Sequence, residues 1–302
     1  MTTPFRILVA GKNGQVATAL SRAQNDDMVV LKAAGRDEMD VTSVGDIEAA
    51  FSSFHPDLLI NTAAYTAVDK AETDAELAFA VNEGGAANLA RISANANVPI
   101  IHLSTDYVFD GKKTAPYSET DAVSPLGVYG KSKLAGEQAV ARANPQHMII
   151  RTSWVYSPYG GNFVSTMLKL AQTRDEIGVV ADQIGHPTSA DDLANGLFGL
   201  ANALRLQSER FQAGLYHMSG ATPASWDELA TFTFQESTRL GGPSATVKQL
   251  SSKEYPTLAP RPANSCLDCR KLEQTYSIRL QDWQSGVRAC LEHTLNPKRA
   301  SS

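Results

Sequence analysis

Residues 104–133 read STDYVFDGKKTAPYSETDAVSPLGVYGKSK, and the rest of the chain is organised around them. Within this stretch a phenol and an amine stand four positions apart, at Tyr129 and Lys133. Positions i and i+4 of a helix share one face, so we expect the Lys133 ammonium beside the Tyr129 ring. A nearby positive charge would lower the pKa of the tyrosine from its ordinary value of about 10. The pair predicts a general acid that gives a proton to an oxygen, although the same spacing also occurs in ordinary helix pairs.

A hydroxyl at Thr105 strengthens this interpretation. It lies 24 residues before Tyr129 and follows an apolar run at 98–103 that reads as a buried strand. In an open parallel sheet, ligand sites form at the carboxyl ends of the strands, where a following helix can also reach the ligand. We therefore expect Thr105 and Tyr129 to hold one carbonyl oxygen between them.

The amino-terminal segment predicts a dinucleotide site. A buried strand at 5–10 leads into GKNGQVA at 11–17 and a helix that continues to about Ala23. Glycines let the backbone approach a phosphate, and the free N–H groups at the start of a helix favour an anion. The spacing G-x-x-G-x-x-A departs from G-x-G-x-x-G, so a plain strand-to-helix turn is the alternative. The expected cofactor residues here are Gly11, Lys12, Asn13, Gly14, Gln15 and Val16.

The ends of the next two strands extend the predicted cofactor site. A strand at 28–34 is followed by Arg36, where an NAD-specific site usually has Asp or Glu. Because an arginine suits a 2′-phosphate, we expect NADPH, with NADH as the alternative and a solvated surface charge as the simpler explanation of Arg36. A strand at 58–61 ends in small residues against which a cofactor could lie, although packing also explains them. The further expected cofactor residues are Asp40, Val41, Ala63, Ala64 and Tyr65.

Strands and helices alternate through residue 156 and predict a Rossmann-type, doubly wound parallel sheet. We expect residues 1–156 to form a dinucleotide-binding domain. We expect residues 157–302 to form mainly a smaller α/β substrate lobe, with a helix near 190–206 returning to the first domain. Further predicted helices are 75–96, 129–143, 162–172, 226–239 and 280–294.

Two pairs of residues within these helices have local explanations. Gly84 and Gly85 interrupt the helix at 75–96, and close approach of another backbone explains them, because each glycine costs about 1 kcal/mol in a helix. Asp191 and Asp192 fall in the first turn of the helix near 190–206, where negative charge is favourable. We interpret them as capping residues rather than metal ligands.

Composition limits the classes of function. The chain has 302 residues, 43% hydrophobic content and a net charge of −5, which argues against broad binding to nucleic acids or anionic membranes. Its apolar runs fall short of the roughly 20 residues that span a bilayer, and its start lacks a signal-peptide pattern. Three cysteines fit a reduced compartment, so we expect a cytoplasmic protein. Cys266 and Cys269 lack a second pair at zinc spacing, and no metal is expected.

With these motifs in place, the chain resembles the extended short-chain dehydrogenase/reductase superfamily and, within it, the family of dTDP-4-dehydrorhamnose reductases. The resemblance covers nearly the whole chain. Its segments are GKNGQVA at 11–17, NTAAYTAVDKAE at 61–72, STDYVFDG at 104–111, YGKSKLAGE at 129–137, RTSWVY at 151–156, DQIGHPT at 182–188 and RPANSCLDCRKL at 261–272. Several of them have no role in generic cofactor binding.

The resemblance implies a reaction and a set of roles. NADPH or NADH would reduce the C4 ketone of dTDP-4-dehydro-L-rhamnose, a step in making dTDP-L-rhamnose for cell-surface polysaccharide. Tyr129 would donate the proton and Lys133 would activate it and anchor a ribose. Thr105 would hold the carbonyl, and Asp106 and Trp154 would contact the sugar.

Several points stay open under this resemblance. Arg261 is a candidate for the substrate diphosphate, with a surface arginine as the equal alternative. Some family members pair through a magnesium site built from acidic side chains, which we cannot match here, so dimerisation is left open. A related nucleotide-sugar reductase or epimerase, and a non-catalytic cofactor-binding regulatory subunit, are the rival functions. A 4,6-dehydratase is disfavoured because Tyr107, not Glu, follows Asp106.

Overall fold

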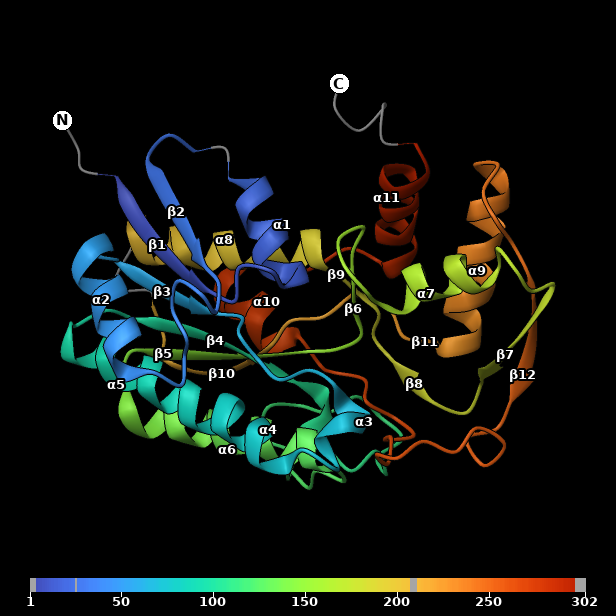
Figure 1. Ribbon diagram of the computed structural model, residues 1–302, viewed down its shortest axis with the longest axis horizontal. Helices are drawn as coiled ribbons and strands as arrows, with labels where there is room; N and C mark the ends of the chain where they lie inside the picture. The colour runs from blue at the N-terminus through green and yellow to red at the C-terminus, as the bar shows by residue number, and fades with distance from the viewer. Residues whose placement is uncertain (1–3, 25, 207–210, 297–302) are drawn as a thin grey trace.

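The computed structural model describes residues 4–24, 26–206 and 211–296 (Figure 1). Its centre is a six-stranded sheet in the order β10-β5-β4-β3-β1-β2, in which every neighbouring pair is parallel. The strands are β1 (Phe5–Ala10), β2 (Val29–Ala34), β3 (Leu58–Asn61), β4 (Ile100–Thr105), β5 (His147–Thr152) and β10 (Gly214–His217). The predicted Rossmann-type parallel sheet is confirmed.

Helices cover both faces of this sheet, and the alternation of side chains along each strand explains why. In β1, Ile7 and Val9 enter one core cluster, whereas Leu8 and Ala10 enter another. The first cluster is shared with α1 (Gln15–Ala23), α8 (Ala190–Leu206) and α10 (Arg270–Tyr276). The second is shared with α2 (Val44–Phe54), α5 (Ala86–Asn95) and α6 (Val128–Ala143). Strands buried on both faces account for the nearly continuous apolar runs in the sequence.

The strand order creates a switch point between β1 and β3. The chain leaves β1 for β2 on one side and then crosses to β3 on the other side. Ligands of open α/β sheets bind where the connections diverge in this way, outside the carboxyl ends of the strands. The turn after β1 and the segment after β3 both lie at this point.

A second group of elements lies beyond the carboxyl ends of these strands, to the right in Figure 1. It contains α7 (Phe163–Leu170), α9 (Trp226–Arg239) and α11 (Trp283–Leu295), which pack around their own apolar clusters. β7 (Glu176–Val180) and β12 (Thr246–Leu250) form a parallel pair beside α9. The short strands are β6 (Val155–Tyr156), β8 (Ile184–Gly185), β9 (Thr188–Ser189) and β11 (Ala224–Ser225). The segment after residue 156 also supplies β10 and α8 to the central layers, and α8 packs against α1.

The helix predicted at 75–96 is divided into three parts. α4 (Ala75–Phe79) and α5 flank a π-helical stretch, η1 (Ala80–Gly85). A Cβ on Gly85 would lie 2.6 Å from Cγ2 of Val41. Gly85 therefore makes room for the Val41 side chain, whereas the sequence predicted close approach of another backbone. Gly84 meets no neighbour so closely. The remaining short helices are α3 (Val68–Ala71) and the 3-10 turn η2 (Asp106–Val108).

Candidate active site

A cavity of about 410 Å³ opens at the carboxyl ends of the central strands and brings Thr105, Tyr129 and Lys133 to one surface. Thr105 ends β4, and the other two residues stand in the first two turns of α6. The predicted residues that line the cavity are Asn13, Gly14, Gln15, Val16, Ala64, Thr105, Asp106, Tyr129, Lys133 and Trp154. The predicted residues outside its lining are Gly11, Lys12, Arg36, Asp40, Val41, Ala63 and Tyr65.

The Tyr129 hydroxyl is buried, although the residue as a whole keeps part of its surface exposed. Burial raises the pKa of Tyr129 to about 12, and the hydrogen bond with the Thr105 side chain lowers it by less. The lowered pKa expected for Tyr129 is therefore wrong for this chain, because removing the phenolate from water outweighs the favourable hydrogen bond with Thr105. Tyr129 is a neutral phenol throughout the physiological pH range, which is the form that can donate a proton.

Lys133 is 3% exposed, and its Nζ donates a hydrogen bond of 2.7 Å to the carbonyl oxygen of Leu103 in β4. Burial lowers the pKa of the Lys133 ammonium to about 8, while the nearby Glu137 raises it by less. This hydrogen bond joins α6 to β4 at Leu103, two residues before Thr105 at the end of the strand. Lys133 thus links the strand and the helix that supply the two hydroxyl groups.

Thr105 Oγ1 lies 3.0 Å from Oδ1 of the buried Asp106 and 3.2 Å from the backbone N–H of Tyr107. A hydroxyl carries one proton and can accept further hydrogen bonds, so Thr105 donates to the carboxylate and accepts from the amide. Burial raises the pKa of Asp106 to about 6. The two hydrogen bonds hold the Thr105 hydroxyl against Asp106 and Tyr107, so it must rotate to donate to a ligand oxygen in the cavity.

A buried ion pair fixes α6 to the two strands beneath it. Arg151 in β5 donates to both carboxylate oxygens of Glu137 in α6, at 2.8 Å through Nε and 2.7 Å through Nη2. Ser104 in β4 donates to Glu137 Oε1 at 2.5 Å. All three residues are buried, with at most 5% of each residue's surface exposed. The network spans β4, α6 and β5 one turn below Lys133, so it sets the position of the Tyr129 helix against Thr105.

The π-helical stretch supports the opposite side of α6. Asn82 in η1 donates to Ser132 Oγ at 2.9 Å and binds both backbone groups of Tyr65 in the segment after β3. Gly136 allows this contact, because a Cβ there would collide with the carbonyl oxygen of Asn82. π-helical turns often mark functional sites. Here the turn connects the predicted cofactor segment at 63–65 to the helix that carries Tyr129.

The turn after β1 forms the other end of the cavity. Gly11 has a φ of 103°, and a Cβ there would lie 2.8 Å from the backbone nitrogen of Ala63. α1 begins after Gly14 with no side-chain cap, so its first N–H groups are free to bind an anion. The Gln15 side chain is fixed, because its Oε1 accepts hydrogen bonds from Ser157 at 2.8 Å and from Asn162 at 3.0 Å.

The charged side chains in the turns after β1 and β2 are paired with one another. Arg36 is 74% exposed and lies 3.0 Å from the carboxylate of Asp40, and Lys12 lies 2.8 Å from that of Glu38. Glu38, which is not among the predicted cofactor residues, also accepts a hydrogen bond from the backbone N–H of Gly35. Exposed pairs of this kind are weak and exchange readily with other partners. A ligand phosphate near this turn would meet two cations that are held by weak contacts.

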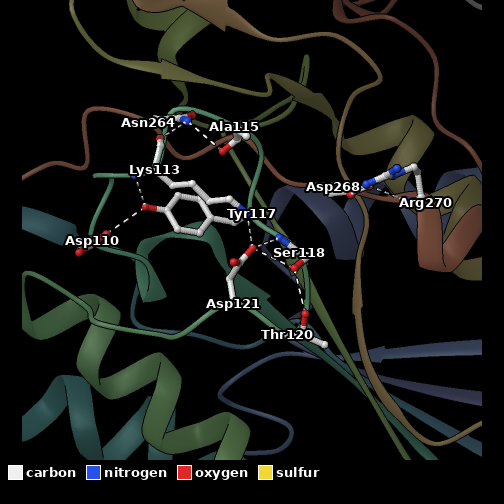
Figure 2. Close-up of polar contacts among 10 residues, drawn as sticks. All are labelled: Asp110, Lys113, Ala115, Tyr117, Ser118, Thr120, Asp121, Asn264, Asp268 and Arg270. Atoms are coloured by element: carbon white, nitrogen blue, oxygen red, sulfur yellow. Dashed lines mark hydrogen bonds and ion pairs between the residues drawn. The ribbon is translucent and has the colours of Figure 1, made fainter.

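The loop between β4 and α6 is held against the carboxyl-terminal segment (Figure 2). Tyr117 donates to Asp110 at 2.9 Å, and Lys113 is paired with Asp121 at 2.6 Å. Asn264 donates to the backbone oxygens of Lys113 and Ala115, as the dashed lines in Figure 2 show. These contacts restrain the long connection between Thr105 and Tyr129.

A second cavity, of about 730 Å³, lies beside this loop and is larger than the first. Its three cationic side chains, Lys113, Arg270 and Arg279, are each paired with a carboxylate. Neither the phosphate-binding turn nor the tyrosine–lysine pair reaches it. Its size therefore does not make it the better candidate for the reaction.

Trp154 lines the first cavity, but Arg261 does not. The Arg261 guanidinium is 17% exposed and lies 2.8 Å from the carboxylate of Asp69, so it is neither a free surface arginine nor a residue of this cavity. The cysteines are free thiols, and burial raises the pKa of Cys266 and Cys269 to about 11. Across the described ranges there is no group of three or more His, Cys, Asp or Glu suited to a metal ion.

Several residues of the cavity were missed from the sequence. They are Thr62, Thr66, Leu103, Ser104, Thr152, Ser153, Val155, Gly160 and Gly161. Thr62 follows β3, Thr152 is the last residue of β5, and Ser153 comes directly after it, so the rule that selected Thr105 would have found them. Gly160 and Gly161 carry the signal of a glycine turn, but only the fold shows that this turn reaches the cavity.

Comparisons with known proteins agree with this geometry. The family model described as "RmlD substrate binding domain" matches residues 5–296. A protein of Sinorhizobium fredii named dTDP-4-dehydrorhamnose reductase is 48% identical, over 94% of this chain and 96% of its own length. One of the same name from Escherichia coli K12 is 40% identical, over 95% and 97%.

Solved structures give the same result. A Bacillus anthracis dTDP-4-dehydrorhamnose reductase in complex with NADP is 33% identical, with a TM-score of 0.89 over 97% of this chain and 100% of that one. The Streptomyces venezuelae dTDP-glucose 4,6-dehydratase DesIV shares only the fold, at 17% identity and a TM-score of 0.77. In the described part of the chain, no helix has the length and apolar character needed to cross a membrane.

Proposed function

This chain belongs to the family of dTDP-4-dehydrorhamnose reductases, and from this membership we propose that it reduces the C4 ketone of dTDP-4-dehydro-L-rhamnose to dTDP-L-rhamnose. The cofactor we assign is NADPH, as in the NADP complex of the Bacillus anthracis relative. The product is the activated sugar of dTDP-rhamnose biosynthesis. One observation carries the proposal: Thr105, Tyr129 and Lys133 line the same cavity as the uncapped start of α1.

The residues around the turn after β1 fit a dinucleotide. The positive φ of Gly11 and the free N–H groups of α1 suit a diphosphate, and Arg36 lies on the side of β2 where a 2′-phosphate is expected. Bound NADPH supplies a hydride to the carbonyl carbon. Ala64 and Asn13, which line the cavity, would border the cofactor, while the side chains of Val41 and Ala63 pack in or against the core.

Tyr129 supplies the proton in this mechanism. As negative charge develops on the C4 oxygen, the neutral phenol donates to it, and the Thr105 hydroxyl rotates from Asp106 to donate as well. Donors aimed at a developing oxyanion contribute on the order of 2.7–4 kcal/mol each to catalysis. Lys133 holds its positive charge beside the phenolate that forms, which stabilises that product of proton transfer.

The decisive test is oxidation of NADPH by the purified protein with dTDP-4-dehydro-L-rhamnose as the substrate. Turnover with this sugar, and formation of dTDP-L-rhamnose identified by mass and by chromatography against a standard, would establish the reaction. Absence of turnover with either NADPH or NADH would contradict it. Stoichiometric NAD retained through purification would favour an epimerase instead, because an epimerase reuses its bound nucleotide.

The pH dependence of kcat/KM should follow the ionisation of the Lys133 ammonium. Its ammonium is protonated below a pKa of about 8 and loses its charge as the pH rises through that value. We expect kcat/KM to fall above pH 8 by about tenfold per pH unit, since kcat/KM follows the ionisation of the free enzyme. In Lys133→Arg, whose side chain stays charged, any residual activity should lack this decline. A wild-type profile that stays flat to about pH 10 would show that the Lys133 charge is not required.

Cofactor preference should depend on Arg36. We expect Arg36→Ala to raise the KM for NADPH about tenfold and to change the KM for NADH by less than about twofold, since a charged hydrogen bond is worth about 1.5–3 kcal/mol. Arg91→Ala, which removes an exposed arginine from α5, is the matched control. If the ratio of the KM for NADPH to the KM for NADH were unchanged in Arg36→Ala, Arg36 would be a solvated surface charge with no contact to the cofactor.

The same proposal assigns cofactor binding and substrate binding to different parts of the chain. We assign residues 1–156 to cofactor binding and most of 157–302 to the sugar nucleotide. This is supported by the position of α7, α9 and α11 beyond the strand ends and by the return of α8 and β10 to the central layers. A cytoplasmic location and a homodimer stay predictions, for which fractionation and sedimentation are the direct measurements.

A further inference from the structure

Trp154, which lines the reaction cavity, has an unusual backbone. It lies between β5 and β6 with a φ of 46°, in the left-handed region that bulky residues seldom adopt. Such a conformation persists only where surrounding contacts hold it, and it occurs most often at functional sites. The contacts that hold Trp154 are therefore informative about how the cavity wall is built.

The main contact is with Trp226. The two indole rings are stacked with their centroids 3.4 Å apart and their planes 5° from parallel. Trp226 is the first residue of α9, where Ser225 and Glu228 exchange capping hydrogen bonds. Phe163, the first residue of α7, packs on Trp226 with a centroid distance of 4.6 Å. Two capped helix starts thus fix the Trp226 ring, and this ring covers one face of the Trp154 indole.

Gly185 makes the second contact. A Cβ on this residue would lie 2.6 Å from Nε1 of Trp154 and closer still to Cε2. Real Cβ atoms do not approach so closely, so only a glycine at this position lets the indole keep its place. Gly185 stands in β8, which pairs with β11, the strand that immediately precedes Trp226. The backbone pairing therefore ties together the two residues that contact the indole.

From this arrangement we propose that Trp226 is a positioning residue for binding of the sugar nucleotide. Trp226 is absent from the cavity lining, so it acts on the substrate only through Trp154. Trp226 covers one face of the indole and Gly185 lies against the ring, so these contacts restrain the orientation of Trp154 where it lines the cavity. An aromatic surface of fixed orientation suits the C–H groups of a sugar ring or the plane of a pyrimidine base.

The role is confined to substrate binding. We assign the hydride and proton transfers to the neighbourhood of Thr105, Tyr129 and Lys133, none of which is in the stack. The ring contacts of the stack join Trp154, Trp226 and Phe163 and do not include the turn after β1. Loss of the Trp226 ring should therefore weaken binding of the sugar nucleotide and leave the chemical step and NADPH binding unchanged. This inference rests on the proposed function of the cavity.

The test compares Trp226→Leu, Trp226→Phe and Gly185→Ala with Phe232→Leu as the control. Phe232 packs against the same apolar cluster and contacts Trp283, with ring centroids 5.1 Å apart, but it touches neither stacked ring by any ring contact. The measurements are kcat, the KM for dTDP-4-dehydro-L-rhamnose, the KM for NADPH, and circular dichroism in the indole bands. The chain has three tryptophans, so coupling between the stacked pair can be assigned with Trp154→Phe.

We expect Trp226→Leu and Gly185→Ala to raise the KM for the sugar nucleotide about tenfold, with kcat and the KM for NADPH within about twofold of the wild type. Trp226→Phe, which keeps an aromatic ring, should recover most of the affinity. Trp226→Leu should lose the coupled indole signal, and Phe232→Leu should retain it together with normal kinetics.

Two results would overturn the role of Trp226. One is loss of the coupled signal in Trp226→Leu with an unchanged KM for the sugar nucleotide. The other is a parallel loss of kcat and both affinities in Trp226→Leu and Phe232→Leu, which would indicate a purely structural contribution. Failure of the wild type itself to turn over the sugar nucleotide would instead contradict the proposed function.

Discussion

Replacing Tyr129 by phenylalanine is expected to lower kcat by about 10²–10⁴-fold, because it removes the group that protonates the C4 oxygen. The ring remains in α6, so the cavity keeps its shape. The phenol of the wild type has a pKa of about 12 and is protonated at neutral pH, so the hydroxyl is a donor in every molecule of the enzyme. The measurement is the initial rate of NADPH oxidation at saturating dTDP-4-dehydro-L-rhamnose.

The loss should appear in kcat far more than in ligand affinity. Proton donation becomes strong only as charge develops on the substrate oxygen, and an interaction of this kind contributes to the transition state rather than to the bound ground state. Titration of NADPH fluorescence should give nearly the same dissociation constant for both proteins.

Tyr216→Phe is the matched control for removal of a buried tyrosine hydroxyl. Tyr216 is 1% exposed in β10, its hydroxyl donates to the backbone oxygen of Gln212 at 3.0 Å, and it lies outside the cavity. We expect its kcat to stay within about twofold of the wild type. Near-normal turnover by Tyr129→Phe would remove this residue from the mechanism and leave Thr105 or a water as the proton donor.

Replacing Arg151 by leucine is expected to destabilise the protein by about 3–5 kcal/mol, because it leaves the Glu137 carboxylate buried without its cation. The pair has exposures of 3% and 6% and receives a further hydrogen bond from Ser104. The midpoint and slope of urea unfolding, followed by circular dichroism, measure the change. Turnover should fall as well, since the pair joins β4 and β5 to the helix that carries Tyr129.

A double mutant separates two contributions to the free energy of unfolding: the destabilisation by an unpaired buried charge and the net stabilisation by the ion pair. Glu137→Leu combined with Arg151→Leu removes both charges, and we expect it to regain much of the stability lost in Arg151→Leu. Arg239→Leu is the surface control, since Arg239 is 53% exposed and its pair with Glu236 should contribute less than about 1 kcal/mol. A loss in Arg151→Leu no greater than in this control would show that water reaches the Glu137 carboxylate.

Local patterns predicted most of the central layers. The apolar runs gave β1 to β4, and helical composition gave α1, α6 and α8 at nearly their observed bounds. These elements are recognisable because each one buries an apolar face, and the regular spacing of its apolar residues can be seen within the element's own sequence. β10 and the two-residue strands were missed, because such short segments become strands only when a partner is beside them.

The same distinction applies to the site. Thr105, Tyr129 and Lys133 were predicted from the strand-end rule and the helical spacing, and the structure places them around one cavity. Arg261 was assigned to a surface or a diphosphate, but the fold pairs it with Asp69, 192 residues away. Trp226 had no local signal, since it meets Trp154 only when β11, the strand before α9, pairs with β8 in the folded chain.

The sequence by itself therefore determined the type of sheet, the cofactor turn and the chemical groups of the reaction, because these depend on spacing within short segments. Only the tertiary structure decided how those groups behave. Burial, which depends on residues far apart in the chain, raises the pKa of Tyr129 and lowers that of Lys133, opposing the effect expected from their adjacency alone. Long-range contacts likewise decided which partner holds Glu137 and which ring fixes Trp154, because side chains distant in sequence meet only when the whole chain has folded.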